Sequence, residues 1–178
     1  MKTLFKTIVF IAILLLFSHC DPDYLKPIHY VDYNPDITIS YDTNNLEGIS
    51  LDLYEDNKND IYVEQIDKYA PEMTCLHDSI FIYYGDRWSC NLDPILENVG
   101  IGNHINYRNW KEVTSRELAL LPSNTDVFIA LKFIKKDGVH YGWIRFRRDP
   151  NVPKWIIKEY AIHNTAEASI LTGQKEGE

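Results

Sequence analysis

The stretch that decides the fold is VFIALKFIKKDGVHYGWIRF, residues 127–146. Apolar side chains stand at every second position of its first half, at Val127, Ile129, Leu131 and Phe133. Alternate residues of a β-strand point to the same face, so this spacing predicts a strand over residues 126–134. The intervening positions are also largely apolar, which predicts a central strand buried on most of its surface.

The residues after this strand predict a hairpin. The sequence Lys-Lys-Asp-Gly at 135–138 has the composition of a tight turn, and a second strand is expected over residues 139–147. In that strand the odd-numbered residues from Val139 to Arg145 share one face, and the even-numbered residues from His140 to Phe146 share the other. Gly142, inside the strand, predicts close approach of another backbone or an aromatic ring.

Short apolar runs separated by turn residues continue on both sides of the hairpin. We expect further strands over residues 37–41, 49–54, 61–66, 79–84 and 155–163, and a single short helix over 115–121, ended by Pro122. Many short strands punctuated by Gly, Pro, Asn and Asp are typical of a sandwich. The fold class predicted is therefore all-β, sandwich-like and mainly antiparallel, over residues 37–174, with a polar tail at 175–178.

The first 19 residues have the features of an export signal. Lys2 and Lys6 precede an unbroken apolar run of 10 residues at 8–17, shorter than the roughly 20 needed to cross a bilayer. The following residues 16–20, LFSHC, resemble the lipobox of bacterial lipoproteins, with His19 at a position that is usually Gly, Ala or Ser. The resemblance implies lipidation of Cys20 and anchoring in the cell envelope. An uncleaved leader is the alternative.

Residues 20–36 are expected to form a lipidated tether, because Pro22, Pro27 and Pro35 oppose helix. Asp21 and Asp23, directly after the cysteine, resemble the surface-export signals of some Gram-negative envelopes, so the outer membrane is the predicted location. The lipid would make the membrane one partner of the protein.

The charge of the chain excludes nucleic-acid binding as an expected function. The formal net charge is −8, and removal of residues 1–19 takes away two lysines and no acids, which makes it −10. Nucleic-acid-binding proteins need a basic face. The other partners considered are therefore a glycan or an envelope protein.

Two cysteines remain once Cys20 carries lipid. Cys75 and Cys90 lie in a chain predicted to be exported, where disulfides persist, so the pair is expected to be bridged. A disulfide that closes a loop of this length would stabilise the folded protein by about 3 kcal/mol. The alternatives are two buried free thiols or, without a CxxC motif or paired histidines to support it, a two-cysteine metal site.

Acids in the stretch LDLYEDNKND, residues 51–60, indicate a candidate calcium site. Asp52, Asp56 and Asp60 resemble the D-x-D-x-D-G-x-x-D loops of exported calcium-binding repeats, and the resemblance implies carboxylate ligands for Ca²⁺. The sequence departs from that pattern at Tyr54 and Asn57. A solvated hairpin turn is the alternative.

The residues HYGWIR at 140–145, followed by Tyr160-Ala161 and by ILTG at 170–173, resemble the HYGW-type C-terminal module of exported or surface-anchored bacterial proteins. The resemblance implies an extracytoplasmic β-rich domain without assigned chemistry. A candidate ligand surface is formed by His140, Tyr141, Trp143 and Arg145. The structural alternative is that the rings belong to a core and that the arginine pairs with local acids.

These observations favour an envelope-anchored lipoprotein with a non-catalytic binding or structural role. Four tryptophans and 12 tyrosines could supply an aromatic platform for a sugar or a protein. The alternative is a small envelope hydrolase acting on glycans or peptides. No metal-binding histidine pair, nucleophile elbow or phosphate loop is found in the sequence.

Overall fold

The computed structural model describes residues 27–41, 48–65, 71–83, 95, 97–102, 110–111, 116–117, 125–149 and 154–177. Within these ranges the protein is all-β and contains no helix. None of these residues belongs to a helix of the length and hydropathy that a membrane span requires. The expected fold class, an antiparallel and sandwich-like all-β domain, is confirmed.

The main sheet has six strands, in the order β1 (Ile28–Ser40), β11 (Lys154–His163), β10 (Gly138–Arg148), β9 (Asp126–Lys135), β5 (Ile80–Tyr83) and β7 (Trp110–Lys111). A second sheet has four strands, in the order β2 (Ile49–Leu51), β3 (Ile61–Glu64), β4 (Glu72–Cys75) and β8 (Arg116–Glu117). A two-stranded ribbon joins β12 (Ile170–Leu171) to β6 (Gly100–Ile101). All of these pairings are antiparallel.

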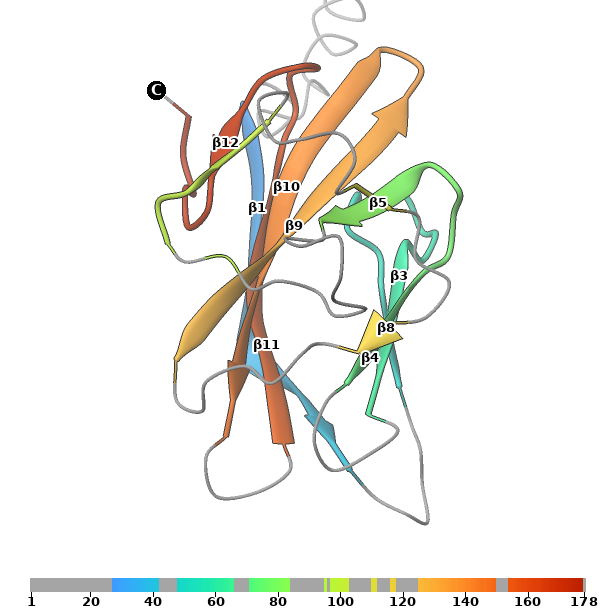
Figure 1. Cartoon of the computed structure of the whole chain (residues 1–178), viewed down its shortest axis with the longest axis vertical. Helices are drawn as coiled ribbons and strands as arrows, with labels where there is room; N and C mark the ends of the chain where they lie inside the picture. The colour runs from blue at the N-terminus through green and yellow to red at the C-terminus, as the bar shows by residue number, and fades with distance from the viewer. Residues whose placement is uncertain are drawn as a thin grey trace, which may run out of the picture.

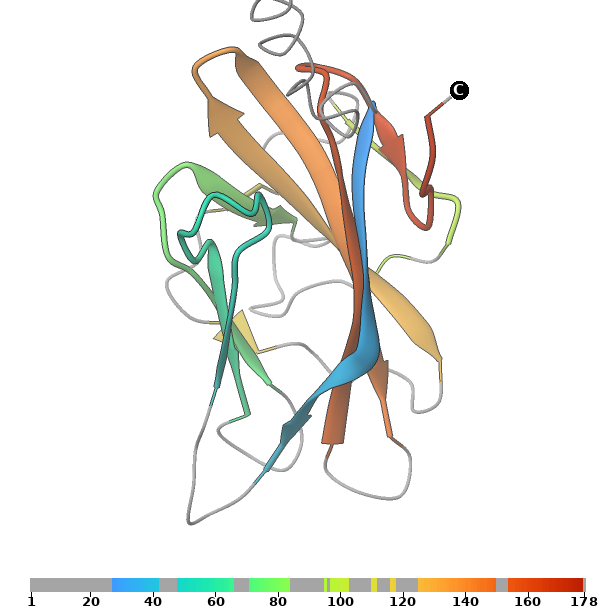
Figure 2. The same ribbon diagram turned by 180° about the vertical axis from the view of Figure 1, so that it is seen from behind.

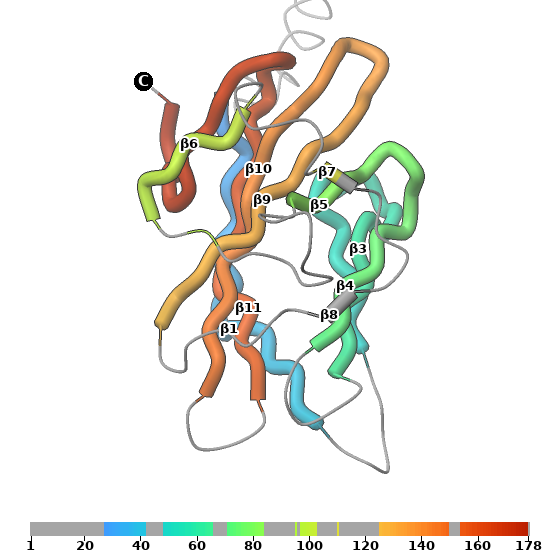
Figure 3. Tube along the Cα trace, viewed as in Figure 1, coloured from blue at the N-terminus to red at the C-terminus, as the bar shows by residue number. Residues whose placement is uncertain are grey.

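The long β9–β10 hairpin lies at the centre of the molecule. Figure 1 shows the four-stranded sheet on one side of this hairpin and the β12 segment on the other. Seen from behind, β1 runs along β11 (Figure 2). Figure 3 traces β6 beside the β12 segment, away from the four-stranded sheet.

The main sheet is buried on both faces. Val127, Ile129, Leu131 and Phe133 pack with Leu51, Ile61, Val63 and Met73 of the second sheet, in the core of the sandwich. On the opposite face Phe128, Tyr141 and Trp143 pack with Ile101 of β6 and Ile170 of β12. Burial of each large apolar side chain contributes about 1.5–3 kcal/mol. The two faces expected for residues 139–147 are therefore confirmed.

Gly142 allows β10 and β11 to lie close together, as the sequence predicted. A Cβ atom at this position would stand 2.6 Å from the carbonyl oxygen of Ala161 and 3.0 Å from a side-chain carbon of Ile162. These contacts leave no room for a larger residue.

Strands are confirmed within every range in which the sequence predicted one. The predicted boundary at residue 37 is wrong, because residues 28–36 belong to β1 and pair with β11, so the expected tether 20–36 overlaps the sheet. Pro35 stands where the pairing register shifts, between Asp32 and Ile37. Proline is tolerated at such a bulge on an edge strand, which is why it does not end β1. Residues 1–26 lie outside the described part.

One further expectation is corrected. Within the helix expected at 115–121, Arg116–Glu117 form β8 and pair with Glu72 and Met73 of β4, so local helical periodicity yields to sheet pairing. At the first residue of the polar tail expected at 175–178, Lys175 is ion-paired with Glu159 of the main sheet.

Candidate functional site

The predicted ligand surface on β10 is not a surface at three of its four positions. Trp143 is fully buried, and Tyr141 and His140 are 2% and 3% exposed. The Trp143 ring meets the Phe128 ring edge-on, with centroids 5.2 Å apart, inside the second core. These three residues therefore belong to the core and stabilise the fold, and they do not form an exposed ligand surface.

His140 is held by two hydrogen-bond partners. Its Nδ1 lies 2.9 Å from the carbonyl oxygen of His163, and its Nε2 lies 3.1 Å from Asp137 Oδ1. These contacts link the β9–β10 turn to the end of β11.

Arg145 is occupied by acidic side chains of the same sheet. Its Nη1 donates to Glu159 Oε1 at 2.6 Å, and its Nη2 is ion-paired with Asp126. Arg147 Nε donates to Asp126 Oδ1 at 2.6 Å. Burial would raise the pKa of Asp126, but the hydrogen bonds from Arg147 and Arg145 outweigh it and hold that pKa below its ordinary value. The arginines therefore pair with local acids, as the structural alternative predicted.

The tryptophan platform suggested by composition is also not found among the described residues. Trp110, Trp143 and Trp155 are all buried, and Trp88 lies outside the described part. The aromatic content of the chain is used for packing at these three positions.

The three aspartates proposed for calcium bind backbone amides instead. Asp52 accepts hydrogen bonds from the amides of Asp56 and Asn57, at 3.2 and 2.7 Å, and Asp60 accepts one from Leu53 at 2.8 Å. No group of three acidic, histidine or cysteine side chains in the described part of the chain is arranged to hold a metal. The structure therefore does not bring Asp52, Asp56 and Asp60 together as one ligand set.

The cysteine pairing stays a prediction. Cys75 is half-buried at the end of β4, and Cys90 lies outside the described residues. No disulfide occurs between residues that the structure describes.

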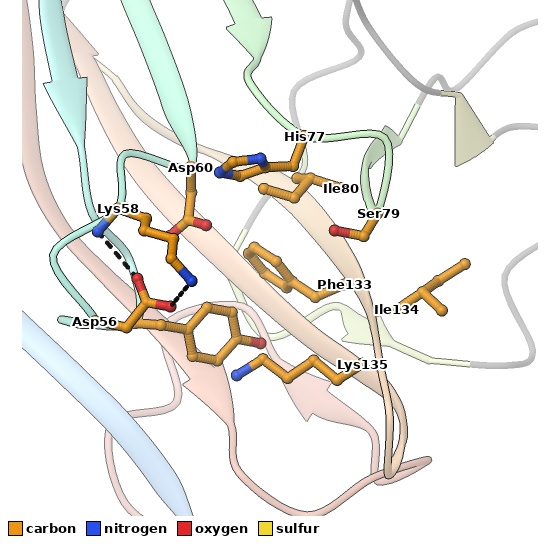
Figure 4. A pocket seen from close by; sticks show the side chains of 10 residues that line it. Asp56, Lys58, Asp60, His77, Ser79, Ile80, Phe133, Ile134 and Lys135 are labelled. Carbon is orange, nitrogen blue, oxygen red and sulfur yellow. Dashed lines mark hydrogen bonds and ion pairs between the residues drawn. The ribbon is translucent and has the colours of Figure 1, made fainter.

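A pocket of about 230 Å³ opens between the two sheets of the sandwich. Its lining comes from the β2–β3 loop, the β4–β5 turn and the ends of β5 and β9 (Figure 4): Tyr54, Asp56, Lys58, Asp60, His77, Ser79, Ile80, Phe133, Ile134 and Lys135. In this view Asp60 and His77 lie at one end and Lys135 at the other, with Phe133 between them. Of the sites that the sequence suggested, this pocket takes in only Asp56 and Asp60.

Asp60 is the buried acid of this pocket. Its amide donates to Leu51 and its carbonyl accepts from Leu76, at 2.8 and 2.9 Å, so its backbone joins the β2–β3 loop to the β4–β5 turn. Burial raises the pKa of Asp60, and the charges of Asp52 and Asp56 act in the same direction against the hydrogen bond from Leu53. The fold thus places a carboxyl group where its charged form is disfavoured.

Tyr54 and Lys135 form the other end of the pocket. The ammonium of Lys135 lies 2.9 Å from the centroid of the Tyr54 ring, which meets Phe133 edge-on at 5.0 Å. Burial lowers the pKa of Lys135, partly offset by Asp137, Asp60 and Asp56. Burial also raises the pKa of Tyr54, so its hydroxyl stays protonated at neutral pH. That hydroxyl is buried, and among the described residues it has no hydrogen-bond partner.

Sequence reasoning did not identify Tyr54, His77, Ser79 or Lys135 as site residues. They come from three separate turns. The pairing of Ile80 with Phe133 brings the β4–β5 turn beside the end of β9, and the hydrogen bond from the Leu76 amide to the Asp60 carbonyl joins the loop that contains Tyr54 to the same turn. The sequence does show charged and polar residues in the turns between the predicted strands. They could not be assigned to one site, because the sequence does not show which turns lie at the same end of the sandwich.

Comparison with protein-family models, with curated proteins and with solved structures finds no match to this chain.

Proposed function

We propose that this protein is a lipoprotein of the bacterial cell envelope, attached through Cys20, whose domain binds a small molecule in the pocket between the two sheets. The observation that supports binding is the pocket itself. It combines an apolar floor, a buried carboxyl group and an ammonium within one cavity of about 230 Å³. Concave sites with an apolar lining and a few convergent polar groups are the usual form of ligand sites.

Binding without catalysis is favoured by how the polar groups are arranged. Nucleophilic catalysis needs a nucleophile hydrogen-bonded to a base. Ser79 and His77 both line the pocket, and in the described part of the chain their side chains share no hydrogen bond. Asp56 is paired with Lys58, at 3.7 Å, and so does not form a second unpaired carboxylate beside Asp60.

The test is a thermal-shift screen of residues 21–178 against sugars, sugar acids, amino acids and dipeptides. The variant Ser79→Trp should fill the pocket and abolish any shift. Asp78→Trp adds the same ring at the neighbouring exposed residue, outside the pocket, and should keep the shift. A compound that stabilises wild type and Ser79→Trp equally would bind elsewhere and contradict the proposal.

A second candidate is the small envelope hydrolase. The observation that favours it is Asp60, a carboxyl group with a raised pKa in a pocket that also contains His77. Such a group is suited to act as a general acid. Hydrolysis of envelope glycans or peptides by the wild-type protein, lost in Asp60→Asn, would establish this function in place of simple binding.

A further inference from the structure

The pocket is suited to a small ligand that has both an apolar part and charged groups. Its volume, about 230 Å³, is below the roughly 300–1,000 Å³ of sites for drug-sized molecules. Phe133 and Ile80 are buried beneath it, and Ile134, at 48% exposed, extends the apolar lining to solvent. A purely polar ligand would leave this lining without a partner.

One end of the pocket offers a negative group. The only hydrogen bond to the side chain of Asp60 within the described residues is that from the Leu53 amide, to Oδ2, and Asp60 is 8% exposed. The neighbouring acid, Asp56, is already paired with Lys58. An ammonium group is the ligand chemistry that would compensate a carboxylate so removed from water.

The opposite end offers a positive group. Within the described residues no carboxylate is ion-paired with Lys135, whose ammonium rests on the Tyr54 ring at 2.9 Å. Asp137, the nearest acid of the same turn, is hydrogen-bonded to His140. The Tyr54 hydroxyl has no hydrogen-bond partner among the described residues, but it is closed to solvent and therefore not open to a ligand. A carboxylate would pair with the Lys135 ammonium.

We infer that the pocket binds a free α-amino acid with an aliphatic side chain, its ammonium toward Asp60, its carboxylate toward Lys135 and its side chain on Phe133 and Ile80. This inference rests on the proposed function, because it names the ligand class of the same site. A molecule with one charge alone would leave the group at the other end of the pocket uncompensated.

The test is calorimetric titration of residues 21–178 with three compounds of one carbon skeleton. L-Leucine carries both charges, N-acetyl-L-leucine only the carboxylate and L-leucinamide only the ammonium. L-Leucine should bind at least about tenfold more tightly than either, as expected for loss of one charge-assisted contact. Equal affinity for all three compounds, or no binding of L-leucine, would overturn the inference.

Two variants separate the ends of the pocket. In Lys135→Met, which keeps an apolar stem over Tyr54, L-leucine and L-leucinamide should bind equally. In Asp60→Asn, which retains an acceptor for the Leu53 amide, L-leucine and N-acetyl-L-leucine should bind equally. Lys136→Met removes a neighbouring exposed lysine outside the pocket and should leave all three affinities unchanged. Leucine affinity that Lys135→Met does not weaken would contradict the inference.

The outcomes also separate this inference from the proposed function. A sugar or sugar acid that binds wild type and fails to bind Ser79→Trp, with no binding of L-leucine, would overturn the amino-acid ligand and leave the binding function intact. Failure of every compound in the screen would overturn both.

Discussion

The ammonium of Lys175 lies 2.7 Å from Glu159 Oε2, so the segment after β12 is ion-paired with a buried residue of the main sheet. Glu159 also accepts hydrogen bonds from the Tyr30 hydroxyl and from Arg145, at 2.5 and 2.6 Å. Burial would raise the pKa of Glu159, but the hydrogen bonds from Lys175, Tyr30 and Arg145 outweigh it and lower that pKa. The carboxylate thus joins β1, β10, β11 and the C-terminal segment.

Lys175→Met should destabilise the domain modestly. Glu159 keeps two partners, and the Lys175 side chain is 45% exposed, so solvent screens its contribution. We expect a loss of about 1 kcal/mol in the free energy of unfolding, measured by urea denaturation at pH 7. Lys136→Met, on the exposed turn, is the control. Equal stability of the two variants would show that the Lys175 ion pair contributes nothing.

Gly142→Ala should be strongly destabilising. The added methyl group would stand 2.6 Å from a backbone oxygen, and backbone in the middle of a sheet has little freedom to move away. Overpacking of this kind costs about 1–3 kcal/mol. Gly48→Ala is the comparison, since its close contact is the far end of a side chain and not backbone: displacing the Tyr62 ring would cost the hydrogen bond from the Gly48 amide to its hydroxyl but would not move a strand. Similar melting temperatures for the two variants would contradict the tight approach of β10 to β11.

Asp60→Asn should change how stability depends on pH. The pKa of Asp60 is raised in the folded state, so its ionisation costs stability above that pKa and costs nothing once the group is protonated in both folded and unfolded states. The difference in free energy of unfolding, variant minus wild type, should therefore be more positive at pH 7 than at pH 3. Denaturation at the two pH values measures this difference. A difference of the opposite sign would mean that the carboxylate is stabilised by its surroundings.

Cys20→Ser should release the protein from membranes, because lipid chains on this residue are the proposed anchor. Fractionation of cells that express the full chain measures the effect. Cys75→Ser, which leaves the lipobox-like residues unchanged, is the control and should remain in the membrane fraction. An unchanged distribution of Cys20→Ser would remove the anchoring proposal.

Cys75 and Cys90 should be recovered as one linked peptide pair under non-reducing conditions. Mass spectrometry would show that pair two hydrogens lighter than the sum of the separate peptides, and reduction should separate it. Quantitative labelling of both thiols in the native protein would exclude the bridge.

The sheet pattern could be predicted wherever alternation extends over many residues. Strand β9 was predicted from four apolar residues that alternate along one face. The close approach of β10 to β11 was predicted from the position of Gly142 inside a strand. Strands β6, β8 and β12 have two residues each, too few for a period, and are defined by their partners.

The site was predicted less well, because its composition is not local. Asp60 was identified as one of three regularly spaced acids, whereas in the structure it lines a pocket with His77 beside it and with Tyr54 and Lys135 at the opposite end. Conversely, the aromatic residues around Trp143 were predicted to form a candidate ligand surface, and the structure places them in the core. Chemical character alone does not tell a buried ring from an exposed one when both faces of the sheet are covered.

Because β9 and β10 contribute side chains to both cores, neither core can lose its order while the other remains intact. Disruption around Trp143 would reach Phe133 and the pocket through the same pair of strands. The domain should therefore melt in one cooperative transition, with the opening of the pocket region coupled to that of the ribbon on the far face. A ligand held between the sheets would accordingly protect β6 and β12, which it does not touch, from exchange with solvent.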